Sequence, residues 1–235
     1  MTINNENNSQ LYWVRDNIIA GEFPGIERAL TEPDGLLAIG GDLNPRRLLV
    51  AYQAGIFPWN NHEQPILWWS PDPRWVLFPD QVKISRSLSR LLRSGKFNVT
   101  CNCNFEQVIK NCAEIRKQTE GTWITPALQS SFIELHRQGF AHSVETWEKG
   151  KLVGGLYGLA IGKIFFGESM FSRVSNASKT ALAKLCELLV AEGFALIDCQ
   201  VHTRHLESLG ATGIPRRKFA EYLGKYCNIN QKLQL

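Results

Sequence analysis

The fold is decided by the stretch Phe166–Leu182, which reads "FGESMFSRVSNASKTAL". It begins as a strand, passes through a polar loop at 172–178 and continues into a segment with the character of a helix. The N-terminus of a helix that follows a strand is a common place for a bound anion, because its free N–H groups point toward the ligand. This loop contains no glycine, so it lacks the tight backbone cradle with which such sites hold a pyrophosphate.

The segments on either side of this stretch predict an α+β fold. Hydrophobic periods of 3.6 and of two residues follow one another along the chain. They predict helices at 104–117, 126–138 and 176–192 and strands at 142–148, 152–160, 163–171 and 194–200. Asn176 is the expected N-cap of the third helix, and "EKGK" at 148–151 is the expected turn of a hairpin. This order of helices and antiparallel strands, without an internal repeat, is typical of an α+β domain.

The N-terminal part has a different character, which predicts a small separate domain. Residues 23–73 are rich in turn-forming residues, and the composition changes after "WWSPDPRWVLFPD". We therefore expect a small domain at 1–73 and a larger one at 74–235. Within the first, Asn44 as N-cap, Pro45 at the first helical position and Gly55 as a stop predict a helix to about Ala54.

Length and composition limit the class of protein. The chain has 235 residues, of which 44% are hydrophobic, and a formal net charge of +4. That apolar content is enough for an ordinary buried core, and no apolar run approaches the roughly 20 residues that cross a bilayer. The first ten residues are polar and lack the features of a secretory signal. We expect this segment to be disordered and the protein to be cytoplasmic, without a membrane contact.

The six cysteines do not indicate a disulfide framework or a metal site. They are scattered along the chain, and the group formed by Cys101, Cys103 and Cys112 has no histidine at ligand spacing. We expect reduced thiols and no bound metal. The cysteines are Cys101, Cys103, Cys112, Cys186, Cys199 and Cys227.

A short basic helix is predicted by "KISRSLSRLLRSGK" at 83–96. Its arginines fall at i, i+4 and i+7 and so form a ridge: Arg86, Arg90 and Arg93. The opposite side is apolar, with Ile84, Leu88, Leu91 and Leu92. Two interpretations stay open, because charge on an exposed helix face is routine and because such a ridge also suits the phosphate backbone of a nucleic acid.

The best-defined candidate chemistry lies in "FALIDCQVHTRH", residues 194–205. Alternation along a strand puts Asp198 and Gln200 on one face and Ile197 and Cys199 on the other. Cys199 then has only apolar neighbours, so a packed cysteine is favoured over a nucleophile. A carboxylate beside a carboxamide can orient the amide oxygen toward an incoming amine. A purely structural polar pair at the end of a strand is the alternative.

The predicted helix 176–192 offers an apolar wall next to this pair. Leu182, Leu185 and Leu189 form a stripe at helical spacing, and Phe165 and Leu156 lie on neighbouring strands. Most such stripes are core. If a cleft opens here, it would accept an unbranched or aromatic side chain.

Taken together, several motifs resemble those of the bacterial leucyl/phenylalanyl-tRNA–protein transferases. The resemblance runs from about Pro24 to Tyr222, in the same order as in that family. The motifs are "GGDL", "AYQAGIFPW", "ILWWSPDPR", "EGTWIT", "GESMFSRVSNASKTAL", "LIDCQV", "LGA" and "IPRR".

The resemblance implies an aminoacyl transfer. The donors would be Leu-tRNA and Phe-tRNA, and less efficiently a methionine donor; the acceptor would be the N-terminal α-amine of a protein beginning with Arg or Lys. The product would enter N-degron degradation. The implied fold is a small N-terminal domain and a larger C-terminal domain of the acyl-CoA N-acyltransferase-like (GNAT) type, acting as a monomer without cofactor. Because the donor would be a tRNA ester and not coenzyme A, a loop without glycine at 172–178 agrees with it.

The resemblance also implies roles for particular residues. Asp198 and Gln200 would be the catalytic pair, Glu168 would receive the basic residue of the acceptor, and Trp59 and Trp123 would contact the terminal adenosine. The pocket for the donor side chain would be lined by Leu156, Phe165, Met170, Leu182, Leu185, Leu189 and Ile197. The acceptor stem of tRNA would contact Lys83, Arg86, Arg90 and Arg93.

Three other functions remain as alternatives to this expectation. A coenzyme-A-dependent acetyltransferase would share the fold but is expected to have the glycine loop that is missing. A tRNA-binding protein without activity would explain the arginines but not Asp198 and Gln200. A cell-wall aminoacyl transferase would use the same donor with a different acceptor.

Overall fold

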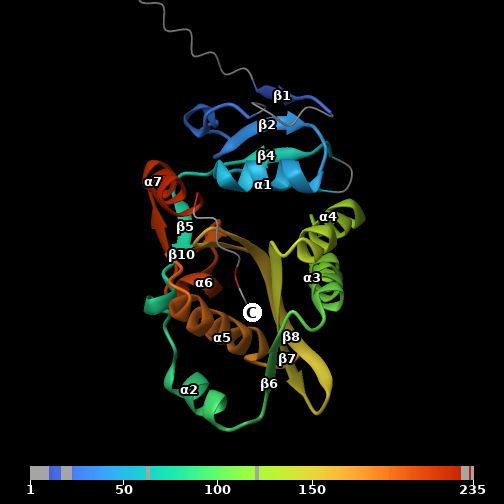
Figure 1. Ribbon diagram of the computed structural model, residues 1–235, viewed down its shortest axis with the longest axis vertical. Coiled ribbons are helices and arrows are strands. Elements are labelled where there is room, and N and C mark those ends of the chain that lie inside the picture. The colour runs from blue at the N-terminus through green and yellow to red at the C-terminus, as the bar shows by residue number, and fades with distance from the viewer. Residues whose placement is uncertain (1–10, 17–22, 62–63, 120–121, 229–232, 234–235) are drawn as a thin grey trace, which may run out of the picture.

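The computed structural model describes residues 11–16, 23–61, 64–119, 122–228 and 233. The polar first ten residues, for which we expected disorder, lie outside these. Two sheets organise the described part, and Figure 1 shows the smaller one, with its helix, above the larger one. The chain runs through the first sheet before it enters the second.

The first sheet has the strand order β1-β2-β4-β3. Its strands are β1 (Tyr12–Val14), β2 (Leu36–Gly40), β3 (Phe57–Pro58) and β4 (Leu67–Trp69), and its helices are α1 (Pro45–Gln53) and a 3₁₀ turn at Ile26–Arg28. Helix α1 begins as predicted, because Asn44 accepts a hydrogen bond from the N–H of Arg46 at 2.9 Å and a proline stands in the first turn. Gly55 then ends the helix with a φ of +80°, which favours glycine.

The second sheet has seven strands in the order β11-β5-β10-β9-β8-β7-β6. They are β5 (Arg74–Leu77), β6 (Asn98–Cys101), β7 (Ala141–Glu148), β8 (Lys151–Ile161), β9 (Ile164–Ser172), β10 (Leu196–Gln200) and β11 (Thr212–Ile214). The helices are α2 (Arg86–Arg93), α3 (Phe105–Thr119), α4 (Pro126–Arg137), α5 (Ala177–Ala191), α6 (Arg204–Ser208), α7 (Arg216–Tyr226) and a 3₁₀ turn at Pro79–Gln81. The α+β prediction is confirmed, and each helix and strand predicted between 104 and 200 is present within a few residues of its expected bounds.

Helices cover both faces of this sheet because its central strands are apolar on both sides. Of two successive residues of β9, Phe165 packs into the core cluster that includes α5, whereas Phe166 packs into the cluster that includes α3 and α4. Figure 1 shows α3 and α4 on one side of the sheet and α5 on the other. Helix α5 lies very close to β8: a Cβ atom on Gly154 would stand 2.5 Å from the Cβ of Ala177.

Strands β9 and β10 separate beyond the middle of the sheet. Their parallel pairing ends at Asp198 opposite Phe166, although β9 continues to Ser172 and β10 to Gln200. Each strand is also irregular on its other side. Gly167 pairs with Gly158 and Ser169 with Tyr157, which leaves Glu168 between them as a bulged residue.

The second irregularity lies at the end of β10. Asp198 pairs with Val76 and Gln200 with Trp75, so the register shifts across Cys199. Gln200 itself has a φ of +58°, in the left-handed region that non-glycine residues rarely occupy. A residue other than glycine in this region has a locally strained backbone, and such strain is common at functional sites.

One prediction about a helix needs correction. Asn176 stands at the N-cap of α5 with a φ of +68°, but its side chain makes no capping hydrogen bond. Helix α2 is present as predicted, and its apolar side is only partly buried: Leu88 is 2% exposed and Leu92 is 40% exposed. Helix α2 lies near the edge of the molecule in Figure 1.

Among the described helices, none combines the length and the apolar character needed to cross a bilayer. All six cysteines are free thiols.

Candidate functional site

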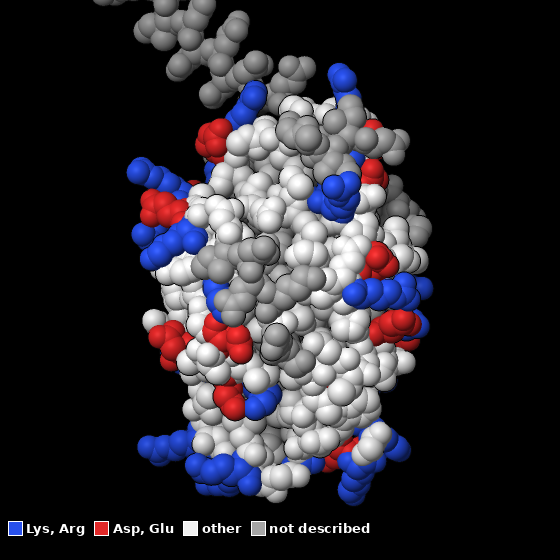
Figure 2. All heavy atoms as spheres, in the orientation of Figure 1, with Lys and Arg blue, Asp and Glu red and all other residues white. Residues whose placement is uncertain are grey.

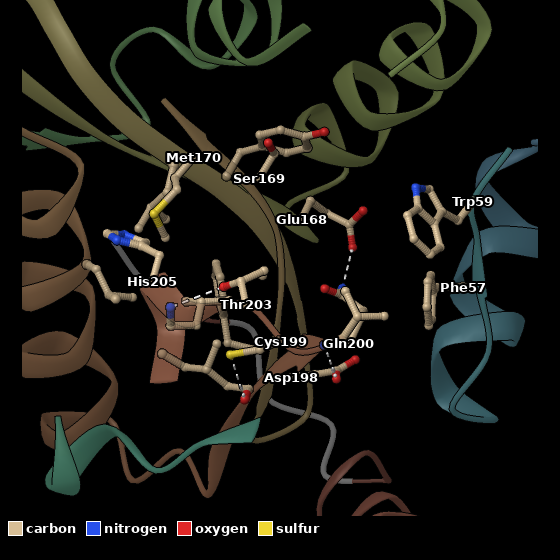
Figure 3. A pocket seen from close by; sticks show the side chains of 18 of the residues that line it. Phe57, Trp59, Glu168, Ser169, Met170, Asp198, Cys199, Gln200, Thr203 and His205 are labelled. Carbon is tan, nitrogen blue, oxygen red and sulfur yellow. Dashed lines mark hydrogen bonds between the residues drawn. The ribbon is translucent and has the colours of Figure 1, made fainter. Parts of the chain in front are cut away.

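A cavity of about 530 Å³ opens where β9 and β10 separate. Residues of both sheets and of α3 and α5 contribute to its wall. In Figure 3, Glu168 and Gln200 lie between Phe57 and Trp59 on one side and Met170 and His205 on the other. The pair formed by Glu168 and Gln200 therefore lies between two parts of the cavity that differ in their chemistry.

One half of the cavity is apolar. Six of the seven residues predicted for the side-chain pocket line it: Leu156, Phe165, Met170, Leu182, Leu185 and Ile197. The seventh, Leu189, is wholly buried in the core and does not line the cavity. It lies one turn of α5 beyond Leu185, past the end of the hollow, so its assignment to the pocket is wrong.

The polar pair is Glu168 on β9 and Gln200 on β10. The Nε2 of Gln200 donates to Oε1 of Glu168 at 3.2 Å, and the hydroxyl of Tyr52 on α1 donates to the same oxygen at 2.7 Å. Both strand residues owe their place to the irregular registers, since one is bulged and the other is left-handed. The first sheet's helix thus takes part in the site directly.

Asp198 has a different role from the one that strand alternation predicted. Its carboxylate is buried and binds Arg74 through two hydrogen bonds of 2.7 Å, from Nε to Oδ1 and from an NH2 nitrogen to Oδ2. Oδ1 also accepts the backbone N–H of Gln200 at 3.0 Å. We expected the carboxylate to orient the carboxamide of Gln200; the structure shows it holding the backbone of Gln200, while Glu168 holds the carboxamide.

The physical reason for this difference is the shifted register at Cys199. In a regular strand, residues two apart would project side by side, but a bulge turns the second away from the first. Cys199 itself lines the cavity yet is 7% exposed, and burial raises the pKa of its thiol further above the ordinary value, with Asp198 adding to the effect. This environment agrees with the prediction that Cys199 is a packed, unreactive cysteine and not a nucleophile.

The carboxyl of Glu168 has an unusual protonation equilibrium. Its pKa is raised from the ordinary value of 4.5 to about 8, chiefly because the group is buried and to a smaller extent because of the charge of Asp198, while the hydrogen bond from Tyr52 and the charge of Arg74 act in the opposite direction. Glu168 is therefore largely protonated at neutral pH when the cavity is empty. A cation beside it would restore its charge.

Aromatic side chains form the other half of the cavity. The rings of Trp59 and Trp123 meet edge to face with centroids 6.2 Å apart, and both line the cavity. Trp59 is 41% exposed, so its face is accessible. The guanidinium of Arg116 on α3 lies 4.6 Å from the centroid of Trp123, and its Nε donates to the hydroxyl of Ser169 at 3.4 Å.

The loop 172–178, from which the sequence argument began, does not line the cavity. The hydroxyl of Ser172 accepts the N–H of Ser178 at 3.2 Å and donates to the carbonyl of Val174 at 2.8 Å. Ser172 thus makes both of these hydrogen bonds within the loop and the start of α5. The loop closes the start of α5, and the cavity opens elsewhere along the helix, at Leu182 and Leu185.

The basic residues of α2 lie apart from the cavity. Lys83, Arg86, Arg90 and Arg93 are all exposed, and none lines the cavity. Figure 2 shows Lys and Arg gathered at the lower end of the molecule, where Figure 1 places α2. The structure brings the predicted cavity residues together and leaves this ridge as a separate surface.

Several residues of the site were missed from the sequence, and among them are Tyr52, Arg74 and Arg116. Tyr52 and Arg74 lie within motifs of the family resemblance, "AYQAGIFPW" and "ILWWSPDPR", so a signal existed for both. Their contacts span 116 and 124 residues of sequence, and no local pattern predicts such distant partners. Nothing in the sequence around Arg116 indicated its role.

The chain is similar to known proteins over most of its length. The profile described as leucyl/phenylalanyl-tRNA protein transferase matches residues 76–224, and the profile of that family's N-terminal domain matches residues 41–72. A leucyl/phenylalanyl-tRNA–protein transferase of Pseudomonas fluorescens (strain Pf0-1) is 56% identical over 216 residues, which cover 92% of this chain and 95% of that protein. The protein of the same name from Pseudomonas aeruginosa PAO1 is 58% identical over 205 residues, covering 87% and 91%.

Solved structures resemble the chain more distantly. One is a GCN5-related N-acetyltransferase from Kribbella flavida, with a TM-score of 0.38, 10% identity and coverage of 70% of this chain and 58% of that one. Another is a predicted acetyltransferase with acetyl-CoA from Clostridium acetobutylicum, with a TM-score of 0.38, 12% identity and coverage of 59% and 95%.

Proposed function

Because the chain belongs to the leucyl/phenylalanyl-tRNA–protein transferase family, we propose that its cavity holds the aminoacyl end of a tRNA beside the α-amine of a protein. The chain is an aminoacyltransferase, with an aminoacyl-tRNA as donor and a protein as acceptor. We assign the donor as Leu-tRNA or Phe-tRNA, with methionine used less. The acceptor is assigned as a protein whose first residue is Arg or Lys, which the transfer marks for N-degron degradation.

The observation that carries this proposal is the meeting of an apolar hollow with the pair formed by Glu168 and Gln200. The side chain of the donor enters the apolar half, next to Leu182 and Leu185 of α5. An apolar pocket separates side chains that differ by one methylene by only about 1–3 kcal/mol. One pocket for both leucine and phenylalanine is therefore physically reasonable.

The reaction joins the α-nitrogen of the acceptor to the carbonyl carbon of the aminoacyl ester and breaks the bond from that carbon to the ribose oxygen. One proton leaves the amine and one is gained by the ribose oxygen, so no other reactant is needed. The ester is already activated, and an α-amine with a pKa near 8 is roughly one tenth neutral at pH 7. The protein has mainly to position the two reactants.

Gln200 and Glu168 divide the positioning of the acceptor. Because Nε2 of Gln200 donates to Glu168, its carboxamide oxygen is the end that accepts a hydrogen bond from the attacking amine. Glu168 faces the basic side chain of the acceptor and becomes ionised when that cation arrives. Asp198 supports Gln200 through its backbone N–H.

The nucleotide part of the donor is assigned to the aromatic half and to α2. Unpaired bases stack on aromatic side chains, so Trp59 and Trp123 suit the terminal adenosine. The phosphates of the acceptor stem are assigned to a row of exposed basic side chains on and next to α2, which are Lys83, Arg86, Arg90 and Arg93. We further propose a monomer that acts in the cytoplasm, since one chain builds the whole cavity and its donor is charged tRNA.

The test of this function is transfer of labelled leucine from Leu-tRNA to a peptide. We expect labelling of a peptide that begins with Arg, and labelling lower by at least tenfold when the first residue is Ala. Tight binding of coenzyme A in calorimetry, or transfer to a muropeptide precursor in place of the peptide, would instead favour an acetyltransferase or a cell-wall enzyme. Binding of tRNA without any transfer would leave the chain a tRNA-binding protein and refute the proposal.

A further inference from the structure

The guanidinium of Arg74, next to Asp198 of the cavity wall, contacts residues of both sheets. It is fully buried. Two of its nitrogens bind the two oxygens of Asp198 at 2.7 Å each, and a third donates to the carbonyl of Gly55 at 3.1 Å. Its nitrogen donors therefore face a strand of the second sheet and the end of α1 at the same time.

Two aromatic rings enclose the same group. The guanidinium carbon lies 4.7 Å from the ring centroid of Phe57 on β3 and 4.7 Å from that of Phe219 on α7. A planar guanidinium between two rings keeps little rotational freedom, and the plane that the rings impose also fits a two-pronged carboxylate. Arg74 is thus fixed by both sheets and by α7.

Asp198 passes this constraint to Gln200. Its Oδ1 accepts both the Nε–H of Arg74 and the backbone N–H of Gln200. Gln200 has a φ of +58°, which a residue with a side chain adopts only when its surroundings hold it there. The hydrogen bond from its N–H to a rigidly held carboxylate supplies such a restraint.

We propose that Arg74 is a positioning residue of the transferase, acting through Asp198 on the backbone of Gln200 and so on the carboxamide beside the cavity. The inference rests on the proposed function, because it concerns the same transfer reaction. Arg74 does not line the cavity and touches neither substrate. It sets where the carboxamide of Gln200 stands when the amine arrives.

Stability alone is a poor explanation for this arrangement. A buried ion pair often adds little net stability, since removal of two charges from water offsets their attraction, and apolar side chains of similar volume can replace such pairs without loss. A bidentate pair at a strained residue next to the reacting groups instead gives geometric precision. Small errors of position in a reaction governed by orientation have a large effect on rate.

The chain contains a matched control for the loss of a buried arginine. Arg47 on α1 is also fully buried and binds Asp42 with two hydrogen bonds of 3.1 Å, far from the cavity wall. Arg74→Gln and Arg47→Gln each remove a buried arginine that binds a carboxylate through two hydrogen bonds, and only the first of these carboxylates leads to Gln200. The side chain of Asp42 is 38% exposed whereas that of Asp198 is buried, so only Arg74→Gln leaves a buried charge without its partner. A third variant, Arg74→Gln with Asp198→Asn, removes the unpaired charge and leaves an amide oxygen that can still accept the N–H of Gln200.

The experiment measures three quantities for each full-length variant: the melting temperature, the Kd for Leu-tRNA and the kcat for transfer to an Arg-starting peptide. We expect both single variants to lower the melting temperature. Arg74→Gln lowers kcat by about 100-fold with Kd unchanged within twofold, whereas Arg47→Gln keeps kcat within threefold of the wild type. Adding Asp198→Asn to Arg74→Gln restores kcat by about tenfold.

Two results would overturn the inference. One is a kcat for Arg74→Gln no lower than that for Arg47→Gln at a temperature where both are folded. The other is a loss in Kd as large as the loss in kcat, which would indicate general damage to the site. A wild-type protein without transfer activity would be a failure of the proposed function and is recognised as such before any variant is compared.

Discussion

At the scale of single residues, the site depends on a carboxyl group that is mostly uncharged when the cavity is empty. Glu168 is bulged out of β9 into contact with Tyr52 and Gln200, and burial raises its pKa to about 8. A neutral carboxyl can accept hydrogen bonds from both neighbours at little electrostatic cost. Under the proposed function, an arriving Arg or Lys would provide the positive charge that ionises it, and capture of the acceptor would be coupled to release of a proton.

Glu168→Gln is expected to weaken use of the peptide more than binding of tRNA. The variant keeps the shape and cannot ionise, so KM for an Arg-starting peptide should rise by about tenfold or more, with Kd for Leu-tRNA within twofold. In the wild type, KM should fall as pH rises from 6.5 to 8, because an increasing fraction of Glu168 has lost its proton before binding. Titration of the peptide's own amine affects the wild type and Glu168→Gln equally. The ratio of their KM values, measured across this pH range, therefore reports the ionisation of Glu168 alone.

If the ratio of the KM of Glu168→Gln to the KM of the wild type stays constant between pH 6.5 and 8.5, proton release is not coupled to acceptor binding. Equal losses of peptide use and tRNA binding would remove Glu168 from the acceptor site altogether.

At the scale of the elements, the cavity lies where the pairing of β9 and β10 ends, and α5 forms part of its wall. Helix α5 contributes Leu182 and Leu185 to the cavity, while Leu189 on the same face packs below it. Neighbouring turns of α5 therefore contribute to the cavity wall and to the core. That arrangement allows pocket shape and core packing to be tested separately.

Leu185→Phe should narrow the pocket and change the choice of donor. We expect transfer of phenylalanine to fall at least tenfold more than transfer of leucine, because the larger donor side chain loses its space first. Leu189→Ala is the control, and it should cost about 2–5 kcal/mol of unfolding free energy with the ratio of the two donors unchanged. A shifted donor ratio in Leu189→Ala, together with an unshifted ratio in Leu185→Phe, would place the pocket elsewhere.

The ridge on α2 should act through salt-dependent attraction to phosphates. Arg90→Ala is expected to raise Kd for tRNA severalfold and to lower the slope of log Kd against log salt by roughly one, without an effect on kcat at saturating tRNA. Arg137 on α4 is 66% exposed at its side chain and serves as the control for loss of one surface charge. Identical salt slopes for wild type and Arg90→Ala would show that the ridge is only a solvated helix face.

The sequence predicted regular elements well and their irregularities not at all. The start of α1 followed from Asn44 and a proline, and the hairpin of β7 and β8 followed from "EKGK", since each depends on neighbours in the chain. The displaced registers at Glu168 and Cys199 result from pairing with strands that are distant in sequence. Strand alternation therefore predicted the side chains of Asp198 and Gln200 side by side. In the structure the bulge turns them apart, and the carboxamide of Gln200 binds Glu168 instead.

At the scale of the whole molecule, the two sheets share one core. The same cluster of buried residues contains Leu48 and Trp68 from the first sheet's region and Phe132 and Phe219 from the second's. Tyr52 and Phe57 add contacts with Glu168 and Arg74 at the site itself. The division into domains at 1–73 and 74–235 stays a prediction, and through these contacts the smaller sheet takes part in the candidate site.

Because of this shared core, we expect the protein to unfold in one cooperative step. Denaturation by urea should give the same midpoint by tryptophan fluorescence and by far-ultraviolet circular dichroism. Two separated transitions would show that the parts are independently stable. In that case Arg74, which binds to both, could not transmit a fixed geometry from one to the other.

The most direct test of the account is a crystal structure with a non-hydrolysable leucyl-adenosine analogue bound. We predict the leucyl side chain between α5 and β10, the adenine against Trp59 and Trp123, and the carbonyl carbon facing the Glu168–Gln200 pair with room for an amine at about 3–3.5 Å. An analogue bound at the start of α5, or one whose carbonyl points away from Gln200, would contradict it.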